Sequence, residues 1–502
     1  MAVADPVVQT TAGKVRGGVE NGAVVFRGIP FAKPPLGTLR FLAPEPPEPW
    51  DGVRDATAFG PPAPQAEFPG VPREAPVTDS GEWLTVNVWT PDLDAKTLPV
   101  LVWIHGGAYL FGTAGEDGYD GGRFARSGVV FVSCNYRLGT EGFAQIPGAP
   151  ANRGLLDVVA ALRWVRENAE RFGGDPDNVT VFGESAGAGV ISALLAMDSA
   201  AGLFRRAVAQ SVPGTTFTPA LAADVTKAIA AVAGVAPTLE ALSGVDPARL
   251  VEAQMAVTAR MREFPRWGAV RLTDTPFSPV VDGQVLPRAP WRALLSGGAR
   301  DVELLTGHNR DEYRLFIVSS GRLGKITEEE AATVLDAFAP APDRAAGYRK
   351  AYPDADPGRL FELVFSDWLF RMPTLHLAQA HAASGGKTFL YELRAEAPGG
   401  GGILGACHAL DVPLVFGQQG SLGVMLTGEQ PPAEFTVLGD LMRTEWLRFG
   451  TCGEPGWPVY GSERRTTRIY DLQPDVAPYP EEASRRLWER HQFDALDLLP
   501  VG

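Results

Sequence analysis

A strand, a glycine-flanked turn and a helix follow one another near the middle of this chain, and that succession limits its possible folds more than any other feature. The apolar run 179–182 predicts a short buried strand, and helical spacing resumes over 190–197. Upstream, the runs 99–104 and 129–133 are almost continuous, which is typical of strands buried on both faces of a parallel sheet. Residues 154–172 have apolar side chains at helical spacing. This alternation predicts a doubly wound α/β fold.

The chain of 502 residues contains no internal repeat and no segment with the composition of an interdomain linker. We therefore expect one domain over 1–502. The proline-rich stretch 44–76 predicts an irregular excursion. The alanine-rich stretch 220–262 predicts helices with no strand between them, inserted as a cap over the sheet.

The turn itself is Gly183-Glu184-Ser185-Ala186-Gly187. A strand before it and a helix after it are the context of a nucleophile elbow, in which a strained turn exposes a serine at the carboxyl end of a sheet. Small residues two positions to either side avoid clashes in such a turn, and the helix N-terminus favours nearby negative charge. Ser185 is the predicted nucleophile, and the alternative is an ordinary serine in a turn.

A serine hydroxyl needs a base to take its proton, and in such folds the acid and then the histidine follow the serine along the chain. His105 precedes Ser185 and is excluded on that order. His408 follows a strand-like run at 389–393 and a glycine-rich loop, so it can reach the edge of the sheet where the serine lies. We therefore predict His408 as the base. The remaining histidines have ordinary structural explanations on helices, at the surface or inside the acid loop: His308, His376, His381 and His491.

The acid must lie between Ser185 and His408. The segment 304–312 is a short apolar run followed by a glycine and two adjacent carboxylates, Asp311 and Glu312. A buried carboxylate there can accept the imidazole N–H and stabilise the imidazolium. The residues alone do not separate the two acids, and the alternative for one of them is the cap of a helix.

Backbone N–H groups must also stabilise the oxyanion. One is expected from Ala186, directly after the serine, and others from the loop 105–108, His-Gly-Gly-Ala, which follows a predicted strand. A simple glycine turn is the alternative explanation for that loop. Its glycines would let the backbone approach a substrate closely.

Composition excludes several other classes of protein. The formal net charge is −14, which disfavours nucleic acid as a partner. No run of eighteen apolar residues is present, so we expect no membrane span, and the opening residues lack the pattern of a signal peptide, which predicts a cytoplasmic location. Three scattered cysteines predict neither a disulfide framework nor a zinc site, and the chemistry above requires no metal or cofactor.

Together these motifs resemble the type-B carboxylesterase family, which includes the cholinesterases and the bacterial para-nitrobenzyl esterases. The resemblance extends over almost the whole chain and is most detailed for bacterial, especially actinobacterial, carboxylesterases. It rests on the segments 26–35 and 84–91 near the start, on 179–187 around the serine, and on 405–417 around the histidine.

This resemblance implies an α/β-hydrolase fold and a serine carboxylesterase acting on small-molecule esters of short to medium chain or with aryl groups. It selects Glu312 rather than Asp311 as the acid, because the family acid is the glutamate of an N-x-D-E segment. It implies Ser185 as nucleophile, His408 as base, and the N–H groups of Gly107, Ala108 and Ala186 as the oxyanion hole. It also matches Arg137 and Asp157 to a structural pair.

Three aromatic residues next to these motifs, Tyr109, Phe111 and Phe416, are predicted to line an apolar substrate pocket, with core packing as the alternative.

Other functions stay open on the same triad, namely a lipase, a thioesterase or an amidase. Some relatives of the family are binding proteins that have lost the serine, whereas this chain retains it. The sequence does not determine the oligomeric state.

Overall fold

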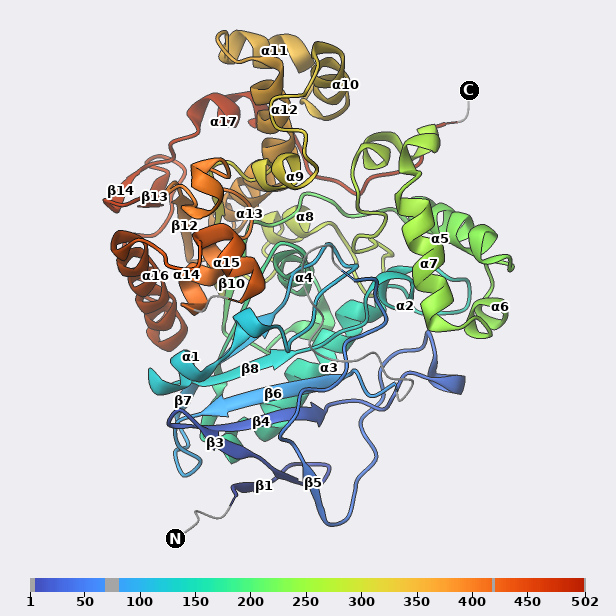
Figure 1. Cartoon of the computed structure of the whole chain (residues 1–502), viewed down its shortest axis with the longest axis vertical. Coiled ribbons are helices and arrows are strands. Elements are labelled where there is room, and N and C mark those ends of the chain that lie inside the picture. Colours follow the sequence, from blue (N-terminus) through green and yellow to red (C-terminus); the bar gives the residue numbers. More distant parts are fainter. Residues whose placement is uncertain (1–4, 68–80, 418–419, 501–502) are drawn as a thin grey trace.

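The computed structural model describes residues 5–67, 81–417 and 420–500, which form one large sheet of eleven strands and a small sheet of three (Figure 1). The strands are β1 Val7–Gln9, β2 Lys14–Arg16, β3 Gly18–Glu20, β4 Ala23–Pro30, β5 Val53–Asp55, β6 Thr85–Thr90, β7 Leu98–Ile104, β8 Val130–Cys134, β9 Gly174–Glu184, β10 Arg206–Gln210, β11 Glu303–Asn309, β12 Thr388–Leu393, β13 Thr466–Tyr470 and β14 Asp475–Pro478.

The α-helices are α1 Gly122–Arg126, α2 Gly139–Phe143, α3 Arg153–Asn168, α4 Ala186–Leu194, α5 Pro219–Ala233, α6 Leu239–Ser243, α7 Pro247–Thr258, α8 Pro290–Leu295, α9 Arg314–Ser319, α10 Glu328–Phe338, α11 Arg344–Ala351, α12 Pro357–Ser366, α13 Met372–Ala383, α14 Asp411–Phe416, α15 Ser421–Thr427, α16 Ala433–Cys452 and α17 Glu482–Trp488. Figure 1 shows α10, α11 and α12 together at one end of the molecule, and α5, α6 and α7 together on one side of it.

The large sheet is parallel in its centre and antiparallel at its ends. Its strand order is β14-β13-β12-β11-β10-β9-β7-β8-β6-β4-β3. Seven successive strands in this order are parallel to one another, namely β8, β7, β9, β10, β11, β12 and β13. Strands β6, β4 and β3 at one end of the sheet and β14 at the other end join antiparallel. The expectation of a doubly wound, largely parallel sheet is confirmed, with antiparallel strands added at both ends.

Side chains on the central strands alternate between two hydrophobic cores, one on each face of the sheet. Along β7, Val100, Val102 and Ile104 belong to the first core, while Leu101 and Trp103 belong to the second. This is the period of two that a strand imposes. Because both faces of the sheet are covered, β7 is most stable with apolar side chains on both of its faces.

The order of the strands determines where a ligand can approach the sheet. The chain passes from β7 to β8 on one side and then crosses to β9 on the other side of β7. In open α/β sheets such a reversal leaves a crevice beyond the carboxyl ends of the two strands. Ile104 at the end of β7 pairs with Gly183 near the end of β9, so the loops after both strands emerge side by side at this crevice.

The proline-rich and the alanine-rich stretches of the sequence differ in secondary structure. The proline-rich stretch is irregular over 44–67 apart from the three-residue strand β5, and positions 68–76 lie outside the described residues. The alanine-rich stretch contains α5, α6 and α7, with no strand in this fully described part of the chain. Within the described ranges, no helix has both the length and the apolar character that crossing a membrane requires.

Arg137, shortly after β8, and Asp157, on α3, form a fully buried, two-point ion pair. Arg137 Nε lies 2.8 Å from Asp157 Oδ2, and its terminal nitrogen lies 2.7 Å from Oδ1. The backbone N–H of Arg137 donates to the same carboxylate, and its other guanidinium nitrogen donates to the carbonyl of Leu42. The pair therefore joins β8, α3 and the N-terminal segment.

Replacing Asp157 with alanine is expected to destabilise the fold by about 3–5 kcal/mol, because Arg137 is left charged and buried without its partner. Urea unfolding of wild type and variant measures the loss. Asp177→Ala is the matched control, since it removes an ion pair with Arg166 in which the aspartate is 78% exposed, and its unfolding midpoint should barely move. Equal midpoints for Asp157→Ala and wild type would contradict the structural role of the pair.

Candidate active site

The turn between β9 and α4 holds Ser185 in a strained backbone conformation. Its φ is 55° and its ψ −124°, and its N–H donates to the carbonyl of Gln210 at 2.9 Å. Glycine is required two positions before and two positions after Ser185, because a Cβ on Gly183 or Gly187 would lie 2.6 Å or 2.1 Å, respectively, from the carbonyl oxygen of Ile104. The turn therefore packs directly against the end of β7. Ser185 is partly exposed, while its neighbours in the turn are buried.

The loop after β7 lies directly against this serine. A Cβ on Gly106 would lie 2.9 Å from the carbonyl oxygen of Glu184 and 3.2 Å from Cβ of Ser185, so glycine permits the close approach. Gly107, Ala108 and Tyr109 all have positive φ values of 106°, 55° and 60°. Strain of this kind persists where the surrounding structure fixes it.

Two contacts fix the start of the loop, and its N–H groups are left available. His105 stacks on Tyr136 with ring centroids 4.5 Å apart, and the Tyr136 hydroxyl donates to the carbonyl of His105 at 2.8 Å. Among the described residues, the N–H groups of Gly107 and Ala108 donate to no other group. The N–H of Ala186 opens α4, where the helix supplies no acceptor. These are the three donors that the sequence predicts.

Glu312 and His408 meet through a short hydrogen bond. His408 Nδ1 lies 2.6 Å from Glu312 Oε2, and the carboxyl group is completely buried. The other oxygen of Glu312 accepts the hydroxyl of Ser211 at 2.6 Å and the N–H of Asn309 at 2.8 Å. Three donors therefore hold the carboxylate in one orientation, with the imidazole as one of them.

The other ring nitrogen of His408 faces the serine turn. Nε2 lies 3.1 Å from Oε1 of Glu184, the residue before Ser185, and it makes no hydrogen bond within the described parts of the chain. No hydrogen bond joins it to the Ser185 hydroxyl in these ranges either; catalytic hydrogen bonds are often loose before substrate binds. The ring of Phe370 stacks on the imidazole at 4.2 Å and limits its movement on one side.

The electrostatics of the site favour a positive charge on His408. Burial alone would lower the pKa of the imidazole, but the carboxylates of Glu184 and Glu312 raise its pKa to about 9. Burial raises the pKa of the Glu184 carboxyl to about 8, against the opposite effect of His408. The site is therefore arranged to stabilise an imidazolium, which is the charge that forms when a serine loses its proton to histidine.

The three aromatic residues predicted for a pocket have different environments. Phe416 is completely buried in the second core, in contact with the rings of Trp103, Tyr119, Phe124, Phe131 and Phe182. It offers no surface to a substrate, and the pocket prediction is corrected for this residue because α14 turns its ring into the core. Tyr109 is also almost completely buried, with its ring against Phe143, whereas Phe111 is partly exposed.

The remaining predicted alternatives do not converge on the serine turn. His308 is completely buried and its ring bonds to the hydroxyl of Tyr479 at 2.9 Å, while His381 bonds to Thr388. Asp311 does not cap a helix, because no side chain caps α9. Its carboxylate turns away from His408 toward Arg310 and Arg359. Over the described residues, no group of three or more histidine, cysteine or acidic side chains could hold a metal ion.

Comparison with known proteins identifies the family. A family model described as "Carboxylesterase family" matches residues 4–474. The chain therefore belongs to the carboxylesterase family. It is 37% identical to the para-nitrobenzyl esterase of Bacillus subtilis (strain 168) over 501 residues, which cover 96% of this chain and 98% of that protein. It is 33% identical to the phenmedipham hydrolase of Pseudarthrobacter oxydans, covering 91% of this chain and 93% of that protein.

Solved structures agree with this membership. The crystal structure of the carboxylesterase EST55 of Geobacillus stearothermophilus at pH 6.2 matches with a TM-score of 0.85 and 36% identity, covering 96% of this chain and 99% of that one. A structure of a PNB esterase matches with a TM-score of 0.85 over 99% of this chain. The predicted α/β-hydrolase fold is confirmed. The protein is a carboxylesterase, which hydrolyses carboxylic esters.

Sequence reasoning missed two polar residues of this carboxylesterase site. Glu184 lies inside the recognised turn, but its approach to His408 depends on a residue more than two hundred positions away. Ser211 directly follows β10, and it reaches Glu312 across 101 positions. The signal that could have found Ser211 is its place at the carboxyl end of a central strand, the edge at which all the other candidate residues gather.

Proposed function

We propose that Ser185, His408 and Glu312 form the catalytic triad of this carboxylesterase. Ser185 Oγ attacks the ester carbonyl while His408 Nε2 accepts its proton, and Glu312 stabilises the imidazolium. His408 then protonates the departing alcohol, leaving an acyl group on Ser185. Water, deprotonated by the same histidine, releases the carboxylic acid and restores the serine. The observation that carries this proposal is the 2.6 Å bond between His408 Nδ1 and Glu312, made while Nε2 of the same ring lies 3.1 Å from Glu184, the residue before Ser185.

The N–H groups of Gly107, Ala108 and Ala186 are proposed as the oxyanion hole. Two features support this. They lie in the loop and the helix start that border Ser185, and the loop N–H groups have no acceptor among the described residues. Such donors act on charge that develops only in the transition state, and one of them contributes about 10²- to 10³-fold to kcat in acyl transfer.

Small-molecule esters with short to medium acyl chains or aryl groups are the proposed substrates. A relative named for para-nitrobenzyl esters supports the aryl part of this proposal. The partly exposed Phe111, next to the oxyanion loop, is the aromatic residue that we propose to contact substrate. We also propose a cytoplasmic location, with which the three unpaired cysteines agree; fractionation of the producing cells tests it.

Hydrolysis of p-nitrophenyl acetate, butyrate, octanoate and palmitate tests the function. We expect rates that are highest for the shorter chains, with an initial burst of p-nitrophenol equal to the enzyme concentration if acyl-enzyme release is slow. A preference for palmitate that strengthens above the solubility limit would indicate a lipase instead. A higher rate on thioesters or anilides than on oxygen esters would indicate a thioesterase or an amidase.

The pH dependence of the rate follows from the charge on His408. Only the neutral ring can accept the serine proton, so kcat/KM should rise with pH as the raised pKa of His408 is passed. Glu184→Gln removes the negative charge that Glu184 carries above its pKa of about 8, 3.1 Å from Nε2, which lowers the pKa of His408 and moves the rising limb to lower pH. Profiles from about pH 6 to about pH 10 measure the shift. Glu445→Gln, at a mostly buried carboxylate paired with Arg468, is the control, and identical limbs in all three proteins would contradict the argument.

A further inference from the structure

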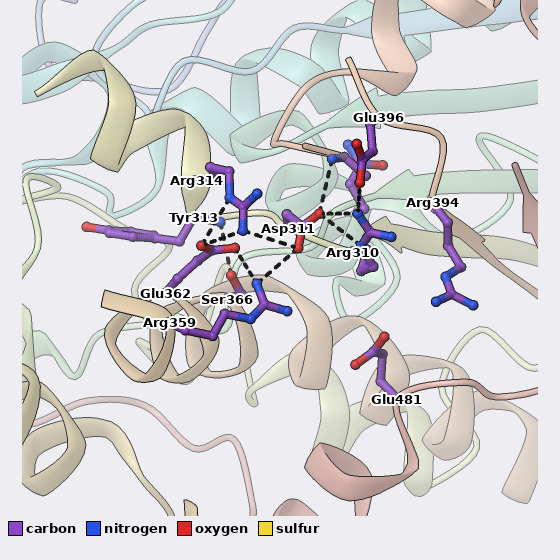
Figure 2. Close-up of polar contacts among 12 residues, drawn as sticks. Arg310, Asp311, Tyr313, Arg314, Arg359, Glu362, Ser366, Arg394, Glu396 and Glu481 are labelled. Carbon is purple, nitrogen blue, oxygen red and sulfur yellow. Dashed lines mark hydrogen bonds and ion pairs between the residues drawn. The ribbon is translucent and has the colours of Figure 1, made fainter. Parts of the chain in front are cut away.

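Asp311, the residue before the proposed acid, is buried in a cluster of charged side chains (Figure 2). Its Oδ2 lies 2.9 Å from Arg310 Nε, and its Oδ1 lies 3.1 Å from a guanidinium nitrogen of Arg359. Burial raises the pKa of an aspartate, but Arg310 and the neighbouring arginines more than offset this and hold the pKa of Asp311 at about 2. The carboxylate is thus ionised in all ordinary conditions.

The same residue is hydrogen-bonded to the loop that carries His408. The N–H of Asp311 donates to the carbonyl of Ala406 at 2.9 Å, and the N–H of Ala406 donates back to Asp311 Oδ2 at 3.2 Å. One residue further along the acid loop and two further along the histidine loop, the N–H of His408 donates to the carbonyl of Glu312 at 3.2 Å. The acid and the histidine loops are therefore paired side by side, and the Asp311 carboxylate accepts from a backbone N–H of the histidine loop, whereas the Glu312 carboxylate accepts from the His408 ring.

The contact between the Asp311 carboxylate and the histidine loop is closely packed. Gly405 has a φ of 57°, and a Cβ there would lie 2.8 Å from Asp311 Oδ2 and 3.1 Å from a guanidinium nitrogen of Arg314. The histidine loop can reach the carboxylate only because position 405 has no side chain. A change at Asp311 is consequently felt by the backbone two and three residues before His408.

Helix α12 anchors the carboxylate from the other side. Glu362 on this helix accepts from Arg359 at 2.7 Å and from Arg314 at 3.0 Å, so the two arginines bridge Glu362 and Asp311. Figure 2 shows the side chains of Arg314, Arg359 and Glu362 grouped beside Asp311. Within the described residues, Glu362 makes no hydrogen bond or ion pair to the histidine loop, although it is buried like Asp311.

We propose that Asp311 is a positioning residue for the ester-hydrolysing reaction, whose carboxylate holds the His408 loop against the Glu312 loop and so fixes where the imidazole meets Ser185. This inference rests on the triad proposed above. Asp311 touches no reacting atom. Its effect passes through Ala406 and the backbone of the histidine loop.

The test compares Asp311→Ala and Asp311→Asn with the control Glu445→Gln, using p-nitrophenyl butyrate. Asp311→Ala should lower kcat by about 10- to 100-fold with little change in KM, because small displacements of a catalytic group cost rate rather than binding. Asp311→Asn retains an oxygen for the Ala406 N–H and should recover part of the loss. Glu445→Gln alters a buried carboxylate that pairs with Arg468 and lies outside this cluster, so its kcat should stay near the wild-type value even if its melting temperature falls.

Equal reductions in kcat for Asp311→Ala and Glu445→Gln, after correction for the folded fraction, would overturn the proposal by making the effect one of stability. A kcat for Asp311→Ala within about twofold of wild type would overturn it as well. If the alanine variant does not fold, the isosteric Asp311→Asn variant decides by the same comparison. The proposed function fails separately, when wild-type enzyme hydrolyses none of the esters or when Ser185→Ala keeps its rate.

Discussion

Ser185→Ala is expected to lower kcat by about 10⁶-fold, and adding His408→Ala should lower it hardly any further. The alanine has no oxygen to attack the ester, and without a nucleophile the base has nothing to deprotonate. Residues that act as one unit therefore lose their effect together rather than in succession. What is left should come from the N–H groups of Gly107, Ala108 and Ala186, which still stabilise an oxyanion formed by attack of water.

Single and double variants measured with p-nitrophenyl butyrate test this non-additivity. Each variant needs its own melting curve, because Ser185 has a strained backbone and a substitution there acts on the stability of the turn. His376→Ala is the matched control for the histidine, since that residue lies on α13 and contacts Phe493 rather than the serine turn. Losses that multiply in the double variant would mean that the two residues act independently, contrary to the triad.

The sequence predicted the parts of the fold that depend on local patterns. The strand before Ser185 and the helix after it were recognisable because their apolar spacing and the flanking glycines are requirements of the turn itself. The same holds for β7 and β8, whose continuous apolar runs reflect burial on both faces. The antiparallel ends of the sheet were not predicted, because short strands such as β3 and β14 are defined by their partners rather than by their own residues.

The contacts that complete the site come from distant parts of the chain. Arg359 and Ala406 meet Asp311 from 48 and 95 positions away, so no local pattern separates the role of Asp311 from that of Glu312. The family resemblance selected Glu312, and the hydrogen bond to His408 agrees with that choice. For Phe416, by contrast, a local pattern misled. Its closeness to His408 along the chain suggested a pocket residue, but α14 directs its ring into the core.

Glu312→Gln is expected to lower kcat by about 10⁴-fold while the fold is preserved. The carboxylate accepts the Nδ1 proton, which leaves Nε2 free to take a proton from Ser185. A glutamine amide is nearly the same size, but Ser211 and Asn309 both donate to Oε1 and would hold the amide oxygen there. The amide NH₂ would then face Nδ1 as a donor, which places the ring proton on Nε2 and removes the base.

Glu312→Asp is the informative partner of this variant, because it keeps the negative charge while shortening the side chain. It should retain more activity than Glu312→Gln, since the charge still selects the productive tautomer even if the hydrogen bond lengthens. Ratios of kcat among the three proteins decide the matter, with melting temperatures to exclude unfolding. A glutamine variant within about tenfold of wild type would remove Glu312 from the triad, and Glu184, 3.1 Å from Nε2, would then be the carboxylate to examine.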